Sequence, residues 1–391
     1  MSCKLLWVEL TFFLFYWRYA GGDFGLVGDQ QPVTTRSAIT WDRDGGYVMF
    51  CLCMGRFGNQ AAHLLGSIAF AKALNRTLVL PPWRILTYVN VPFTEWFQLE
   101  PIADYHKTVT MEQFMGQLAE DHWPPHQRQG YCKVAISEEK GCAMKEGNPY
   151  RPFWNQLGVE FVDSIYTGLS YDVHIPSVAD DWMNKFPARQ HPVITLRRAP
   201  ARFPLLPHNR HLHKLLRWSA HITSIATEHV RAHMDTSPYL GLHFRIDYGW
   251  QQLCKDGVGQ RSYLESLQCL DVLPDRVTSW DICYPSRDAL QNQINQVLET
   301  HSDIKHVYIA TDDIVAFDKL QLKFDDQITV HLSERQPQVD LFILARANQF
   351  IGTCPSSFSA FIKRERDTLG LSSMFWGLTG HVYIPEPDML L

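Results

Sequence analysis

The turn at residues 54–60 has the composition of a phosphate-binding loop. It joins an expected strand at residues 47–51 to an expected helix at residues 60–74, and its two glycines, Gly55 and Gly58, let a ligand approach the backbone closely. Unpaired N–H groups and the dipole at a helix N-terminus favour an anionic ligand. The turn matches neither a GxGxxG fingerprint nor a Walker A loop, so a simple tight turn is the alternative.

Arg245 stands at the end of an apolar strand, where His243, Phe244 and Arg245 follow residues 239–242. A guanidinium is always charged and offers two parallel N–H donors to phosphate oxygens without needing a metal ion. We therefore expect Arg245 to contact a phosphate. The alternative is a structural salt bridge with an interior aspartate.

A second candidate phosphate site is the loop at residues 352–358, which leads from an expected strand into a helix expected at residues 359–367. Its N–H groups and hydroxyls suit an anion, and Ser356 or Ser357 can cap the helix. Asp340 opens the preceding helix, where a carboxylate also suits the helix dipole. It can alternatively accept hydrogen bonds from ribose hydroxyls or from a guanine edge.

Metal and hydrolase signals are weak. Asp42 and Asp44 have DxD spacing, but they precede the first strand instead of following one. The histidines at 208, 211 and 213 lack a carboxylate or HExxH context and are expected in a solvated loop. No GxSxG elbow is present, so a serine hydrolase has no candidate nucleophile.

Two α/β halves must position these residues. Residues 47–80 follow a strand, helix, strand order, and the second half alternates strands at 239–246, 306–311, 328–332 and 350–352 with helices. A linker is expected near residues 187–207. Two such halves favour a ligand in a cleft at the carboxyl ends of the strands.

Composition supports a two-domain globular protein. The chain has 391 residues, of which 46% are hydrophobic, and its net charge is -5. A single core stops growing near about 250 to 300 residues, so two domains are expected. The net charge and the lack of a long basic run argue against nucleic-acid binding.

The N-terminus resembles a secretory signal peptide. Lys4 precedes a mostly apolar run at residues 5–17, which is shorter than the roughly 20 residues of a membrane span. Glu9 within the run keeps a buried N-terminal helix as the alternative. Loss of residues 1–22 would leave eight of the nine cysteines, an even number that suits disulfides, with buried free thiols as the alternative. Asn75 opens a glycosylation sequon.

Five groups of short segments together carry a family resemblance. In chain order they are residues 55–60, 74–78 with 81–83, 144–149, 243–245, and 356–358 with 363–367. Across residues 45–370 they resemble the protein O-fucosyltransferase 1 family of GDP-fucose-dependent enzymes.

The resemblance implies an α/β fold of the GT-B type, with two Rossmann-like domains facing a central cleft. We expect a signal peptide at residues 1–22, an acceptor-side domain at 40–190 and a GDP-fucose-side domain at 191–391, whose last helix can pack back on the first domain. Such an enzyme inverts the configuration at the anomeric carbon of the sugar. It transfers fucose to Ser or Thr of folded EGF-like domains, as in Notch receptors and ligands. The family implies a location in the endoplasmic reticulum lumen, and we expect a monomer with no membrane span and no obligatory metal or other cofactor.

Residue by residue, the family's donor site falls on Arg56, Phe57, Gly58, Asn59, His243, Phe244, Arg245, Asp340, Ser357 and Phe358. We expect Arg245, assisted by the Ser357 hydroxyl and the Phe358 N–H, to stabilise charge on the departing β-phosphate. Asn59 is no general base because an amide is not appreciably basic, but its carbonyl oxygen can orient the acceptor hydroxyl. Arg245 and Asn59 are thus the expected catalytic residues, and no base is identified.

The family's disulfides, transferred by position, would join Cys51 to Cys53, Cys132 to Cys142, Cys254 to Cys283 and Cys269 to Cys354. Two features depart from the family pattern. The acid often found just before the tryptophan at 250 is displaced to Asp247, and residues 388–391 are not a KDEL-like signal.

Three other functions remain as alternatives. One is a related fucosyltransferase that acts on thrombospondin repeats. Another is a lumenal folding partner that holds EGF-like domains without transferring sugar, although Arg245 and Asn59 argue against it. A nicotinamide oxidoreductase would need a GxGxxG turn, which is missing.

Overall fold

The structure is a computed structural model and describes residues 45–391 except 86–88, 134–141, 334–335, 386–388 and 390–391. The expected signal peptide at residues 1–22 lies outside the described residues. So do Asp42 and Asp44 of the DxD pair.

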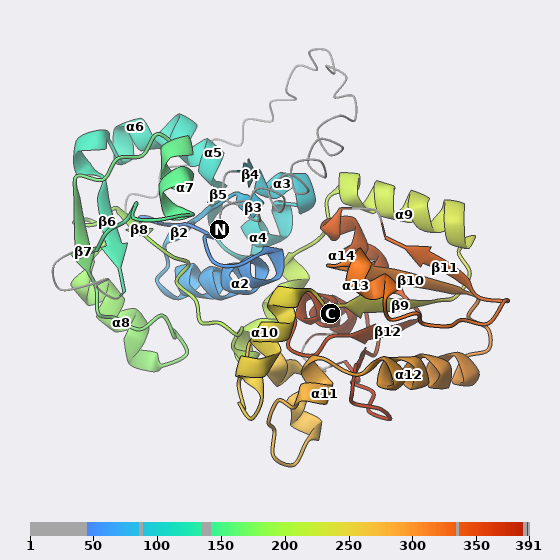
Figure 1. Ribbon diagram of the computed structural model, residues 1–391. Coiled ribbons are helices and arrows are strands. Elements are labelled where there is room, and N and C mark those ends of the chain that lie inside the picture. The colour runs from blue at the N-terminus through green and yellow to red at the C-terminus, as the bar shows by residue number, and fades with distance from the viewer. Residues whose placement is uncertain (1–44, 86–88, 134–141, 334–335, 386–388, 390–391) are drawn as a thin grey trace, which may run out of the picture. The chain divides into compact units, whose positions relative to one another are not determined.

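The first half of the described chain forms a parallel sheet of six strands (Figure 1). In spatial order these are β5 (Thr108–Thr110), β2 (Thr77–Leu80), β1 (Tyr47–Phe50), β8 (Val193–Leu196), β6 (Gln129–Cys132) and β7 (Asp163–Tyr166). The central strands β1 and β8 are buried along their whole length. This is expected of parallel strands covered by helices on both faces.

Several helices and one hairpin accompany the first sheet. They are α2 (Phe57–Ala73), α3 (Phe93–Trp96), α4 (Glu100–Tyr105), α5 (Met111–Gln113), α6 (Ala119–His122), α7 (Tyr150–Gln156) and α8 (Pro176–Lys185), with β3 (Trp83–Ile85) antiparallel to β4 (Val89–Val91). A π-helix at Phe114–Leu118 and a 3₁₀ helix at Pro125–Gln127 complete this half.

The second half forms a parallel sheet of five described strands. Their order is β11 (Thr329–Leu332), β10 (His306–Thr311), β9 (Tyr239–Phe244), β12 (Gln349–Gly352) and β13 (Met374–Phe375). The helices of this half are α9 (Ala220–Met234), α10 (Tyr248–Gly257), α11 (Trp280–Cys283), α12 (Arg287–Thr300), α13 (Ile314–Asp318), α14 (Pro337–Arg346) and α15 (Ser357–Thr368), with short 3₁₀ helices at Pro207–Leu215, Ser266–Gln268 and Leu270–Val272.

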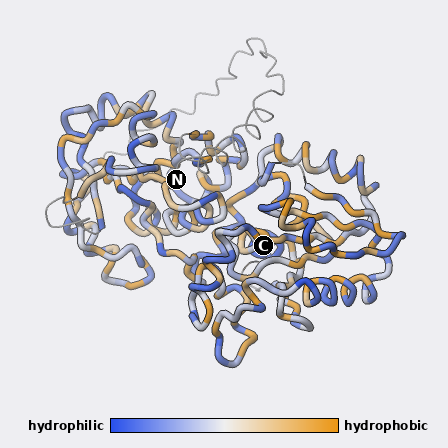
Figure 2. Tube along the Cα trace, in the orientation of Figure 1, coloured by the Kyte–Doolittle hydropathy of each residue, from blue (hydrophilic) through white to orange (hydrophobic). Residues whose placement is uncertain are grey.

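Alternate residues of β9 face different layers. Leu240, Leu242 and Phe244 pack with the apolar face of α12, including Leu290 and Ile294. The opposite side of the sheet packs with α14, and α14 in turn packs with α9. Figure 2 shows hydrophobic residues gathered in the strands. The two-residue period of a strand thus places His243 and Phe244 on opposite faces of the sheet.

Two sequence expectations are wrong in detail. The segment 187–207, expected to be a linker, contains β8, which pairs with β1 and β6 and so extends the first sheet beyond residue 190. The histidine-rich segment forms the 3₁₀ helix Pro207–Leu215 rather than a loop, and although His208 is exposed and His211 half-buried, His213 is not solvated. In that helix His213 is fully buried and lies 3.2 Å from the Glu365 carboxylate.

The last helix, α15, is buried despite its charges. Residues 363–367 are Lys, Arg, Glu, Arg and Asp, and all are at most 6% exposed. Glu365 accepts hydrogen bonds from Trp218 Nε1 at 3.0 Å and His213 Nε2 at 3.2 Å. Because each charge has a partner, the helix can pack against α2 on one side and α14 on the other.

Among the described residues four disulfides join Cys51 to Cys53, Cys132 to Cys142, Cys254 to Cys283 and Cys269 to Cys354. These are the pairs implied by the family resemblance. The last of them links the segment between β9 and α12 to the loop that leads into α15.

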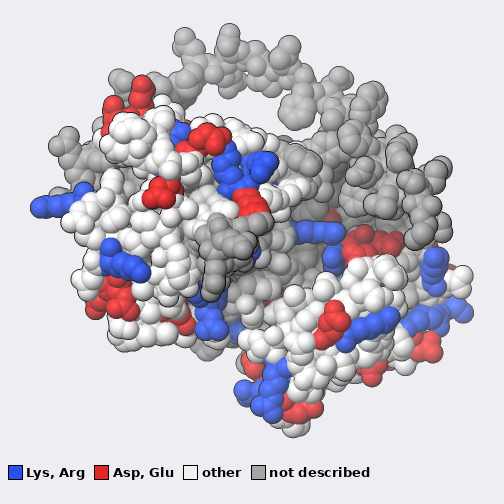
Figure 3. Space-filling model, turned by 60° about the vertical axis from the view of Figure 1, so that its left-hand side comes forward, with Lys and Arg blue, Asp and Glu red and all other residues white. Residues whose placement is uncertain are grey.

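The surface carries charges of both signs. On the face shown in Figure 3, basic and acidic side chains are interspersed over the described residues. Within the described ranges, the helices are all too short or too polar to cross a bilayer.

We predict that the Arg366→Met substitution destabilises the fold. The buried Arg366 guanidinium donates to the carbonyl oxygens of Ser372, Ala345 and Ala347 at 2.6 to 3.1 Å. Methionine would leave these carbonyls without their donor, and the free energy of unfolding should fall by about 3 kcal/mol. Urea unfolding followed by tryptophan fluorescence measures this. The exposed Arg261→Met is the matched control and should unfold like the wild type.

Candidate functional site

The glycine turn is held in place from its own helix. α2 begins at Phe57, so Gly58 and Asn59 lie in its first turn rather than before it. Gly55 has a φ of +66°, a conformation that favours glycine. The buried Gln60 amide donates to the Gly55 carbonyl at 3.2 Å and to the Arg84 carbonyl of β3 at 2.8 Å. Gln60 thereby fixes the turn to the first half of the molecule.

Gly58 touches the start of α15. A Cβ added at Gly58 would lie 2.6 Å from the Ser357 carbonyl oxygen and 2.7 Å from its hydroxyl oxygen. These distances are too short for any side chain, so only glycine allows this approach. The structure therefore brings together two of the expected site residues, and with them the N-termini of α2 and α15.

Phe57 fills the space beside this contact. Its ring lies 5.0 Å from the ring of Trp83, 5.6 Å from that of Trp96 and 5.2 Å from that of Phe361 in α15. The side chain is thus committed to packing between α2 and α15.

His243 connects β9 to α15. Its Nδ1 lies 2.7 Å from the Ser359 hydroxyl, and its ring stacks on Phe358 at 4.6 Å. Burial, together with the nearby Arg245 charge, lowers the pKa of His243 to about 3, so the ring is neutral at physiological pH. Thr353 completes the connection, because its hydroxyl donates to the His243 carbonyl at 3.3 Å.

The start of α15 is capped by Ser356. The Ser356 hydroxyl accepts from the Phe358 N–H at 3.3 Å, so the N–H expected to face a phosphate is used by the cap in this structure. The Ser357 hydroxyl, in contrast, lies at the Gly58 contact. Of the two serines, Ser357 is therefore the better placed toward the glycine turn.

Arg245 is paired with two carboxylates. Its Nη1 lies 2.7 Å from Asp312 Oδ2 and its Nη2 lies 3.3 Å from Asp247 Oδ2, while a fifth of the side chain is exposed. The salt bridge that the sequence left as an alternative therefore exists. The backbone N–H of Arg245 donates to the Thr353 hydroxyl at 3.2 Å, which ties the arginine to the loop before α15.

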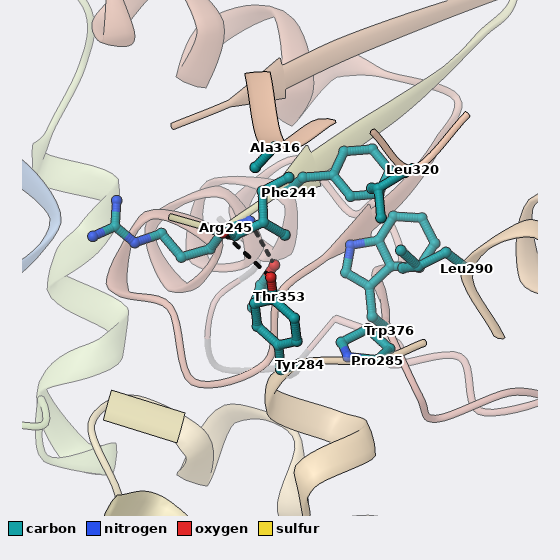
Figure 4. Close-up of a pocket in the computed structure, with 10 residues that line it drawn as sticks. Phe244, Arg245, Tyr284, Pro285, Leu290, Ala316, Leu320, Thr353 and Trp376 are labelled. Carbon is teal, nitrogen blue, oxygen red and sulfur yellow. Dashed lines mark hydrogen bonds between the residues drawn. The ribbon is translucent and has the colours of Figure 1, made fainter. Parts of the chain in front are cut away.

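A pocket lies on the other side of the Arg245 backbone. Its walls include Phe244, Tyr284, Leu290 and Trp376, and Phe244 stacks on Trp376 at 4.9 Å. In Figure 4 the Arg245 guanidinium points away from this pocket. The Phe244 side chain thus belongs to the apolar side of the sheet and not to the side that carries His243.

Asp340 is buried in the first turn of α14. It accepts a hydrogen bond from the Tyr308 hydroxyl of β10 at 2.7 Å and another from the Ser333 hydroxyl, which follows β11. The carboxylate is therefore anchored near the end of β11.

Sequence reasoning missed two residues that organise the site, Ser359 and Asp312, and it included Thr353 only as part of the candidate loop at residues 352–358. Asp312 directly follows β10, and Thr353 directly follows β12, so their places at strand ends were the available signal. No group of three or more potential metal ligands occurs among the residues that the structure describes.

Comparison with known proteins identifies the family. A sequence profile described as GDP-fucose protein O-fucosyltransferase matches residues 47–369. GDP-fucose protein O-fucosyltransferase 1 of Caenorhabditis elegans is 37% identical over 355 residues, which cover 85% of this chain and 90% of the relative.

Crystal structures of POFUT1 are similar to this structure. The complex with GDP-fucose has a TM-score of 0.80 at 35% identity and the complex with GDP has 0.79 at 36%, each covering 86% of this chain and 100% of the other. The expected α/β class, with two Rossmann-like halves, is confirmed by this match and by the two parallel sheets. The chain belongs to the GDP-fucose protein O-fucosyltransferase family.

Proposed function

We propose that this protein is a peptide O-fucosyltransferase that moves fucose from GDP-fucose to Ser or Thr of folded EGF-like domains. The observation that carries the proposal is the contact of Gly58 with Ser357. It joins two helix N-termini, both favourable for a diphosphate, next to the loop that is hydrogen-bonded to Arg245. Family membership supplies the donor, GDP-fucose.

The donor's diphosphate is proposed to lie where α15 begins. The Ser357 hydroxyl can donate to a phosphate oxygen, and Arg245 can supply a charged fork of N–H donors. His243, which is neutral and packed against Phe358, keeps the start of α15 in register with the end of β9. Asp340 is proposed to contact the guanosine end of the donor.

The acceptor is proposed to approach from the side of α2. Asn59 is half-buried in the first turn of that helix, beside Gly55. Its side-chain carbonyl oxygen can accept a hydrogen bond from the acceptor hydroxyl and hold it in line with the sugar carbon. Arg56, exposed at the N-cap of α2, adds a positive charge near the same place.

The proposed reaction is a single displacement with inversion. The acceptor oxygen forms a bond to the sugar carbon as the bond to the β-phosphate oxygen breaks, and the electron pair leaves with GDP. Positive donors fixed around the β-phosphate favour this step because they stabilise charge that grows only as the bond breaks. The hydroxyl proton is lost to water or to a phosphate oxygen, since no side chain is assigned as the base.

A lumenal location in the endoplasmic reticulum is part of the proposal. Four disulfides suit an oxidising compartment, and folded EGF-like domains occur on proteins of the same route. Asn75 of the sequon is exposed in the turn between α2 and β2, as glycosylation would require.

Direct transfer is the first test. Purified protein is incubated with GDP-fucose and either a folded EGF-like repeat or a folded thrombospondin repeat, and each repeat is weighed by mass spectrometry. We expect one fucose to be added to the EGF-like repeat alone. Addition to the thrombospondin repeat alone would assign the related fucosyltransferase activity. Binding of the EGF-like repeat without any mass change would indicate a folding partner instead.

We predict that Arg245→Ala lowers the rate of transfer by about 10² to 10³, since one charged donor to the leaving group is lost. GDP affinity, measured by calorimetry, should weaken much less because Ser357 and the helix N-termini remain. The exposed Arg261→Ala is the matched control. Near wild-type turnover in Arg245→Ala would remove this residue from the mechanism.

We predict that Gly58→Ala separates α2 from α15 and weakens GDP-fucose binding by about tenfold, because the new methyl group would overlap Ser357. Gly116→Ala is the matched control, since a Cβ at Gly116 meets nothing within 4 Å. Affinities come from calorimetry and folding from circular dichroism. Equal affinities in the two variants would contradict the proposed place of the diphosphate.

A further inference from the structure

The surroundings of Arg245 carry more negative than positive charge. Asp312 and Asp247 both lie within ion-pair distance of one guanidinium. Burial, together with the charges of Asp312, Asp313 and Asp247, raises the pKa of the Tyr284 hydroxyl, which shows how closely these acids gather. A diphosphate is itself an anion. It can use Arg245 fully only if one carboxylate gives up its place.

The two carboxylates are held differently. Asp312 is one-tenth exposed, and its Oδ1 accepts from the Ile246 N–H at 2.8 Å, next to Arg245 in the chain. Its Oδ2 has the shorter contact with the guanidinium, 2.7 Å. Asp312 is thus fixed to the same backbone that carries Arg245 and is the better anchor.

Asp247 has both a looser contact and another partner. It lies 3.3 Å from the guanidinium and is about one-quarter exposed, and its Oδ1 caps α10 by accepting from the Trp250 N–H at 2.6 Å. Arg56 of the glycine turn is close enough for its charge to act on Asp247. Asp247 can therefore lose Arg245 and still keep a hydrogen bond and a nearby positive charge.

The pKa values of Asp312 and Asp247 are shifted in opposite directions. Burial raises the pKa of Asp312 to about 6, against the opposing effect of the Arg245 charge. Although burial acts the same way on Asp247, a side-chain hydrogen bond with Asp312, the hydrogen bond from the Trp250 N–H and the charges of Arg245 and Arg56 hold the pKa of that carboxyl below its usual range. At neutral pH Asp247 is thus an anion that competes with a phosphate for the same guanidinium.

We propose that Asp312 is the positioning residue that aims the Arg245 guanidinium, and that Asp247 occupies the diphosphate's place on Arg245 until the donor binds. This inference rests on the proposed function, because it takes Arg245 as the residue that meets the diphosphate. It adds a role for two acids that the donor itself does not require.

The first test concerns Asp247→Asn. Asparagine can still cap α10, so the fold is kept, but the competing charge is gone. GDP affinity, measured by calorimetry, should rise by about threefold or more, the effect of losing one partly exposed ion pair. Uncharged guanosine should bind the variant and the wild type equally. Unchanged or weaker binding of GDP by Asp247→Asn would overturn the competing role.

The second test concerns Asp312→Asn. Loss of the anchor should lower kcat by about tenfold to a hundredfold, as expected for a misplaced catalytic group, while KM for GDP-fucose changes by less. Asp312→Glu, which keeps the charge on a longer side chain, should recover part of kcat and serves as the second variant if the asparagine protein does not fold. Equal kcat values in all three proteins, or a loss confined to KM, would overturn the positioning role.

Asp313→Asn is the matched control. Asp313 lies in the same loop and caps α13 through the Ala316 N–H at 2.9 Å, a bond that asparagine can also make. It should leave kcat, KM and GDP affinity unchanged. If the wild type neither binds GDP nor transfers fucose, the proposed function fails. If it does both while Asp247→Asn and Asp312→Asn behave like Asp313→Asn, only the present inference fails.

Discussion

The close approach of α2 to α15 at Gly58 and Ser357 is the constraint on which the candidate site depends. A side chain at position 58 would separate the helices, and the hydroxyl of Ser357 would then move away from the glycine turn. The rings of Phe57 and Phe361 fill the neighbouring space and leave the two helices little freedom to slide. The absence of a Cβ at Gly58 therefore allows the N-termini of α2 and α15 to lie next to each other.

The buried charged residues of α15 help to keep its N-terminus close to α2. A helix with five consecutive charged residues is normally expected to face water, yet here residues 363–367 are all buried. Lys363 pairs with Asp367 at 2.7 Å, and Arg366 is surrounded by carbonyl oxygens. Because such groups are costly to bury unless every partner is present, α15 has few alternative packings. Its N-terminus is accordingly held in one position.

Sequence alone predicted the alternation of strands and helices and the loops at the carboxyl ends of the strands. Gly58 and Arg245 were selected because a glycine turn and a strand end have local signatures, whereas the choice of Ser357 over Ser356 and the site role of His243 came from the family resemblance. What sequence could not supply was distance between remote segments. The pairing of Arg245 with Asp312 spans 67 positions and has no periodic or compositional trace. The same reason explains why His213 was misassigned, since its burial depends on Glu365, far along the chain.

The segment between β9 and α12 explains why the loop before α15 can be rigid while the Arg245 guanidinium can exchange one of its ion-pair partners. Two contacts hold the loop before α15. One is the Cys269–Cys354 disulfide, and the other is the buried Gln268 amide, which donates to the Cys354 and Ser356 carbonyls. The same segment includes Asp247 at the start of α10, and the contact of Asp247 with Arg245 is partly exposed to water. Covalent and buried contacts therefore fix the backbone of this loop, whereas the guanidinium, anchored by Asp312, has in Asp247 a second ion pair that an incoming anion can replace. Fixed donors lower the reorganisation needed as charge develops, and an exchangeable arginine lets the ligand-free site balance its own charge.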